Sequence, residues 1–125
     1  MRPFRAILML LAGLLFGLQA HAAEPLETKK IEALIAHIAQ LQGATFVRNG
    51  SDHTPAEAAE HLRMKWRRAG DRVKTADDFI RLCASKSYLS GKPYQIRFAD
   101  GRVFDTGPYL RQQLLRQYLP AGSRR

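Results

Sequence analysis

The sequence predicts an α+β fold in which about four helices pack on a small antiparallel hairpin or sheet, as a single compact domain. Three observations predict it. Apolar residues recur at helical spacing early in the chain, two capping patterns mark helix starts in its middle, and a strand pair with a tight turn precedes a last helical segment. A chain of 125 residues has room for one small hydrophobic core.

The first helix is predicted between Glu27 and Gln42. Its buried stripe follows from the spacing of the apolar residues Ile31, Leu34, Ile35, Ile38 and Leu41. Gly43 ends it, and "ATFVRNG" then supplies β-branched and aromatic residues before an Asn-Gly pair that favours a turn. We expect this segment, around Phe46, to be extended.

Two helices with marked starts follow. In "TPAE", Thr54 occupies the N-cap position, Pro55 the first helical position and Glu57 the third, so a helix is predicted from Pro55 to about Ala69. Thr75 and Asp78 repeat the capping pattern, which predicts a further helix to about Ser85.

The strongest hairpin pattern lies near the C-terminus. Tyr94, Ile96 and Phe98 alternate with polar residues, Asp100-Gly101 forms a turn, and apolar residues resume at Val103. A lone hairpin is marginally stable, so we expect the segment around Phe46 to pair with it or the helices to cover it. Pro108 marks the start of a last helix.

The N-terminus has the pattern of a cleaved secretory signal. Arg2 and Arg5 precede an apolar run, and Ala20 and Ala22 are the small residues of a cleavage site after Ala22. The sequence therefore predicts a signal peptide at 1–22, a globular domain at 23–119 and a flexible basic tail at 120–125. We expect a periplasmic protein without a membrane span after cleavage.

The chain is basic, with 20 Lys and Arg against 11 Asp and Glu, and losing Arg2 and Arg5 with the signal lowers its formal net charge from +9 to +7. Such an excess favours anionic partners, which in an exported protein are lipid head groups, lipopolysaccharide or wall polymers ahead of nucleic acid. A basic surface without any partner is nevertheless the favoured interpretation, because net charge governs steering and not function. Cys83, the single cysteine, is predicted to be a buried apolar residue, the alternative being an intermolecular disulfide.

His53, Glu57 and His61 offer enough nitrogen and oxygen ligands for a zinc site. Their spacing matches no zincin pattern, and Glu57 already has a role in the capping box. The chain also lacks a Gly-x-Ser-x-Gly elbow and a Gly-rich phosphate loop. We therefore assign no catalytic residue and no cofactor.

A set of polar residues near the second helix is not explained by capping: Arg48, Asn49, His61 and Lys65. His61 and Lys65 are four residues apart and lie at the border of the apolar stripe formed by Ala58, Leu62 and Trp66. Such a border fits an anion or carbohydrate site, but internal hydrogen bonds that hold the turn to the helix are the favoured interpretation.

The ordered motifs "FVRNG", "HLRMK", "TADDFI", Ala84-Ser85 and "SGKPY" resemble the YfeK-like family of small exported proteins of Gram-negative bacteria. The resemblance covers about residues 31–115 and implies a periplasmic, single-domain protein. It brings no known activity, ligand or catalytic residue. It marks as family-typical Arg48, Asn49, Gly50, His61, Leu62, Lys65, Ser85, Gly91, Pro93 and Tyr94.

Our main hypothesis is a monomeric exported binding or accessory protein, rather than an enzyme, for an anionic envelope ligand or another envelope protein. Its predicted ligand-binding residues are Arg48, Asn49, His61, Lys65, Ser85 and Tyr94. One alternative is a hydrolase-type envelope enzyme that uses His61 as a base, with or without a metal. The other is a purely structural or interaction protein.

Overall fold

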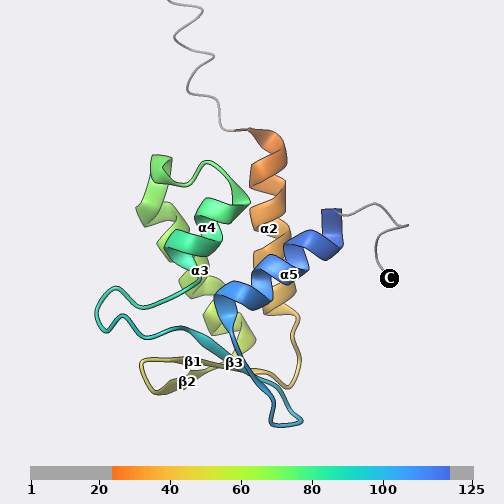
Figure 1. The fold of residues 1–125 in the computed structure, drawn as a ribbon, viewed down its shortest axis with the longest axis vertical. Coiled ribbons are helices and arrows are strands. Elements are labelled where there is room, and N and C mark those ends of the chain that lie inside the picture. Colours follow the sequence, from red (N-terminus) through yellow and green to blue (C-terminus); the bar gives the residue numbers. More distant parts are fainter. Residues whose placement is uncertain (1–23, 119–125) are drawn as a thin grey trace, which may run out of the picture.

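The computed structural model describes residues 24–118, and the predicted signal peptide and basic tail lie outside them. The helices are α2 (Pro25–Ala39), α3 (Pro55–Ala69), α4 (Ala76–Cys83) and α5 (Thr106–Tyr118), with a short 3-10 turn η1 (Gly70–Arg72). The strands are β1 (Thr45–Arg48), β2 (Ser51–His53), β3 (Gln95–Arg97) and β4 (Val103–Asp105). The helices gather on one side of the sheet, which confirms the α+β prediction (Figure 1). In this part of the chain no helix has the length and apolar character needed to cross a membrane.

Helix α2 is the centre of the helical layer, since it contacts α3, α4 and α5. Its stripe is buried as predicted, with Ile31, Leu34, Ile35 and Ile38 between 0% and 2% exposed. Burial of each such side chain stabilises the fold by about 1.5–3 kcal/mol. The helix runs from Pro25 to Ala39, so it begins and ends earlier than the predicted range.

Both predicted capping boxes are present. At α3, Thr54 Oγ1 accepts from the Glu57 amide at 3.2 Å, and Glu57 Oε1 accepts from the Thr54 amide at 3.3 Å. Thr75 and Asp78 form the same reciprocal pair at α4. Helix α4 ends at Cys83, two residues before the predicted end, and this cysteine is buried as expected.

The strands form one antiparallel sheet of order β2-β1-β3-β4. The pairing of β1 with β3 confirms the expectation that the segment around Phe46 joins the hairpin. Strand β2 was not predicted because "SDH" has no apolar alternation. It forms because Asn49 and Gly50 adopt positive φ angles of 51° and 75°, which close a two-residue turn after β1.

Alternation along the strands places polar residues beneath the helices. Phe46 and Ile96 pair with each other and face the core, at 7% and 0% exposed. Successive side chains point to opposite faces, so Arg48 lies on the same face as Phe46, under α3. The other face is polar, with an Arg97–Asp52 ion pair at 2.7 Å.

Helix α5 begins at Thr106, two residues before Pro108, and packs closely against the segment that follows α4. Ser85 Oγ donates to the Ile80 carbonyl at 2.6 Å. A Cβ added at Gly107 would lie 2.7 Å from that Oγ and 3.4 Å from Ser85 Cβ. Glycine at this position therefore lets α5 approach the end of α4.

We predict that Gly107→Ala destabilises the protein by about 1–3 kcal/mol, because the new methyl overpacks this contact. Urea unfolding of the variant and the wild type measures the difference. Adding Ser85→Ala to the Gly107→Ala variant removes the closest atom and is expected to recover part of the loss. A Gly107→Ala variant as stable as the wild type would show that the contact is not tight.

Candidate functional site

The ammonium of Lys65, on α3, is enclosed by two tyrosines. Its Nζ lies 4.5 Å from the ring centroid of Tyr88 and 4.8 Å from that of Tyr94, and it donates to the Tyr94 hydroxyl at 2.8 Å. A longer contact of 3.4 Å joins it to the Lys86 carbonyl. Lys65 is only 9% exposed, and burial lowers its pKa below the usual value. The face of the Tyr88 ring and the hydroxyl of Tyr94 stabilise the buried cation.

His61 lies one helical turn before Lys65 and faces the same tyrosine. Its Nε2 is 3.4 Å from the Tyr94 hydroxyl, with the two rings edge to face. Burial, followed by the positive charges of Arg48 and Lys65, lowers its pKa to about 4. Since Lys65 can only donate to the Tyr94 hydroxyl, that hydroxyl is left to donate to a neutral imidazole.

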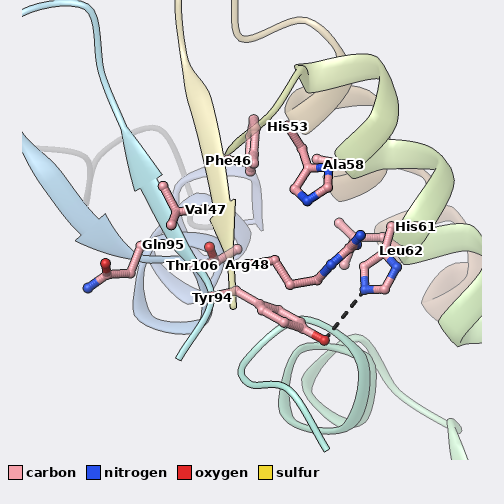
Figure 2. A pocket seen from close by; sticks show the side chains of 10 residues that line it. All are labelled: Phe46, Val47, Arg48, His53, Ala58, His61, Leu62, Tyr94, Gln95 and Thr106. Atoms are coloured by element: carbon pink, nitrogen blue, oxygen red, sulfur yellow. Dashed lines mark hydrogen bonds between the residues drawn. The ribbon is translucent and has the colours of Figure 1, made fainter. Parts of the chain in front are cut away.

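Arg48 reaches the same place from the sheet. Figure 2 shows its side chain extending between Tyr94 and the α3 residues His61 and Leu62. Arg48, His61 and Tyr94 border a cavity of about 30 Å³ whose surface is almost wholly apolar and which is lined by Phe46, Val47, Arg48, His53, Ala58, His61, Leu62, Tyr94, Gln95 and Thr106. The space is too small and too apolar for a charged ligand, which would have to lie at its mouth.

The cluster of Arg48, His61, Lys65 and Tyr94, which we term the cationic cluster, has no acidic partner within the described chain. None of the ion pairs among residues 24–118 involves Arg48, His61 or Lys65. Arg68 adds to the positive charge that acts on His61. Buried and half-buried cations are normally paired with an anion, so this arrangement favours an anionic ligand.

Asn49 acts on the neighbouring loop instead of the cluster. Its Nδ2 donates to Ser87 Oγ at 3.1 Å, and its Oδ1 accepts from Ser90 Oγ. Residues 86–93, which we term loop 86–93, are thereby fastened to the β1–β2 turn. Asn49 thus shapes the surroundings of the cationic cluster from outside it.

Ser85 is a second predicted site residue that lies outside the cationic cluster. Its hydroxyl donates to Ile80 and lies against Gly107, between α4 and α5. Its carbonyl accepts from the Tyr94 amide at 3.0 Å, which is a backbone role. Sequence reasoning missed Tyr88, since no spacing in "SKSYLSG" predicts that its ring covers a lysine on another helix.

The three residues considered for zinc do not converge on one point. Glu57 caps α3, His53 Nδ1 lies 3.6 Å from Glu57 Oε2, and His61 turns to Tyr94. No group of three or more potential metal ligands converges anywhere in residues 24–118. A pKa of about 4 also makes His61 a weak base, whereas a general base works best with a pKa near the operating pH.

Comparison with known proteins agrees with the resemblance seen in the sequence motifs. A family model described as a family of unknown function (DUF5329) matches residues 25–118. The uncharacterized protein YfeK of Salmonella typhimurium strain LT2 is 44% identical over 68 residues, which are 54% of this chain. The match spans 57% of the length of that relative. No solved structure matches the chain significantly.

The depressed pKa of His61 predicts a loss of stability on acidification. The unfolded chain binds a proton at His61 near pH 6.5, whereas the folded protein binds it near pH 4. Stability therefore falls as the pH is lowered from 6.5 to 4. We expect the wild type to lose roughly 1–2 kcal/mol more than His61→Gln over this range, a value reduced by solvent screening.

Urea unfolding of both proteins at several pH values measures this difference, and the shared titration of all other groups cancels. Parallel stability curves for the wild type and His61→Gln would contradict the buried, neutral state of His61.

The contacts of Lys65 predict that it holds loop 86–93 in place. Lys65→Met loses hydrogen bonds, but it also removes the cost of burying a charge. These two effects offset each other, so the free energy of unfolding should change little. Loop opening should nevertheless increase about tenfold, the equivalent of one hydrogen bond. Hydrogen exchange of the Ser87 and Gly91 amides, which bond within the loop, reports this opening.

Arg67→Met is the matched control, because Arg67 lies exposed on the same helix. Equal loop exchange in the two variants would show that Lys65 does not anchor the loop.

Proposed function

Since the chain belongs to the DUF5329 family, whose description assigns no activity, we propose from the site itself that it is an exported binding or accessory protein. Its cationic cluster receives an anionic group of an envelope ligand or of another envelope protein. The observation that carries the proposal is the gathering of Arg48 and His61 beside Tyr94 (Figure 2), together with Lys65, without a carboxylate partner in residues 24–118.

The cluster offers different kinds of contact to an anion. The guanidinium of Arg48 has a planar set of donors that fits a carboxylate or phosphate with two parallel hydrogen bonds. Lys65 is held by Tyr88 and Tyr94, so its charge is fixed in position before binding. This preorganisation reduces the entropy cost of binding.

His61 makes binding sensitive to protons. A bound anion would offset the positive field of Arg48 and Lys65 and so raise the pKa of His61 from about 4. Anion binding is therefore coupled to proton uptake, and affinity increases as the pH falls through the range in which His61 titrates.

The exported location rests on the signal pattern of residues 1–22, and the basic balance of the chain favours anionic partners in that compartment. An anionic group carried by an envelope glycan, a small molecule or an acidic protein segment would meet the same chemistry at the cluster. The ligand class is therefore defined by its anionic group.

We predict that Arg48→Gln weakens binding of inorganic phosphate at least tenfold, because it removes a charge-assisted hydrogen-bonding group. Isothermal titration or NMR chemical-shift perturbation measures the affinity, and acetate serves as a carboxylate probe. Arg97→Gln is the matched control, since Arg97 has the same charge but lies on the outer face of the sheet.

The same three proteins can then be used to capture ligands from an envelope extract, with mass spectrometry of proteins and small molecules. We expect a species retained by the wild type and by Arg97→Gln but lost with Arg48→Gln. Equal phosphate affinities and identical captured species for all three proteins would contradict an anion site at the cluster.

A further inference from the structure

Loop 86–93 presents apolar side chains to solvent. Leu89 is 95% exposed and Tyr88 is 64% exposed. Figure 1 shows the loop projecting between the end of α4 and the start of β3, on the side opposite the end of α5. Covering Leu89 would remove apolar surface from water and gain free energy.

The loop holds Leu89 in this exposed position through its own hydrogen bonds. The hydroxyl of Ser87, a residue only 4% exposed, accepts from the amides of Leu89 and Ser90 at 3.2 and 3.4 Å. The Gly91 amide donates to the Ser87 carbonyl at 2.9 Å, and the Ser87 amide donates to the Lys92 carbonyl at 3.0 Å. Because these hydrogen bonds already fix the loop, it does not have to become ordered on binding a partner.

Tyr88 braces the loop against the domain. Its hydroxyl donates to the Leu82 carbonyl at 2.6 Å, and its ring covers the ammonium of Lys65. The remaining exposed part of the ring stands beside Leu89 in the chain. Tyrosine, with an apolar body and a polar tip, is suited to the boundary between lipid and water.

The charges of the loop select one kind of partner. Lys86 and Lys92 are exposed and are neighbours at its base, where an isolated bridge joins Lys86 to Pro93. Residues 86–93 contain no Asp or Glu, and the whole chain carries a formal net charge of +9. An apolar tip with lysines at its base complements an anionic bilayer, whereas a protein partner would need a matching apolar pocket for one side chain.

We propose that loop 86–93 docks the protein reversibly on an anionic phospholipid surface. Leu89 enters the boundary of the acyl chains, Tyr88 lies at head-group level, and Lys86 and Lys92 face the lipid phosphates. A single leucine and two lysines give weak, salt-sensitive attachment, since even one long acyl chain anchors a protein only marginally. This docking does not require an anion bound at Arg48.

Vesicle co-sedimentation tests the proposal, using protein recovered from the periplasm of an expression host with its N-terminus established by mass spectrometry. We expect the wild type to bind vesicles that contain phosphatidylglycerol, to bind less at high salt, and to bind pure phosphatidylcholine vesicles weakly. Leu89→Ser should weaken binding to the anionic vesicles about tenfold, and Lys86→Glu with Lys92→Glu should also weaken it.

Leu115→Ser is the matched control, because Leu115 is 57% exposed on α5, away from the loop, and it should bind like the wild type. Arg48→Gln should also retain vesicle binding, which separates this proposal from the anion site. The proposal is overturned when the wild type shows no preference for anionic vesicles, or when Leu89→Ser binds like Leu115→Ser. If position 89 cross-links to another protein while the wild type shows no affinity for vesicles, the partner of the loop is a protein and not a lipid.

Discussion

The polar half of this domain depends on one lysine ammonium held between two tyrosine rings. Lys65 joins α3 to the Lys86 carbonyl, to Tyr88 in loop 86–93 and to Tyr94 at the entrance of β3. The Tyr88 ring face and the Tyr94 hydroxyl compensate the burial of the charge, so it is retained where no acidic residue of the described chain pairs with it. A carboxylate in the place of Tyr94 would neutralise the positive charge of the cluster, to which we assign an anionic ligand.

Two surfaces follow from this arrangement. On the inner side, β1 directs Arg48 under α3 because it alternates with Phe46, which anchors the strand in the core. On the outer side, the loop braced by Tyr88 displays Leu89. The helices support both surfaces, since the buried stripe of α2 packs against α3 and α4. The core thus positions both surfaces without contributing chemistry to either.

The sequence was informative where local chemistry decides the structure. Capping boxes at Thr54 and Thr75 and the hairpin after Tyr94 were predicted because each is determined by adjacent residues. Helical spacing also placed His61 and Lys65 at the border of the buried stripe. The depth of Lys65 was not predictable, because it depends on Tyr88 and Tyr94, which reach it across the fold. Ser85, chosen as a site residue from its loop, serves the packing of α4 on α5 instead.

The most direct test of the central claim is the pKa of the His61 imidazole, measured by NMR with and without sulfate, which remains a dianion in the relevant pH range. Our account predicts a pKa of about 4 in the free protein. It predicts a clear increase as sulfate saturates the cluster, because the anion offsets the charges of Arg48 and Lys65. An ordinary pKa near 6.5, unchanged by sulfate, would contradict both the buried cationic cluster and its assignment to an anion.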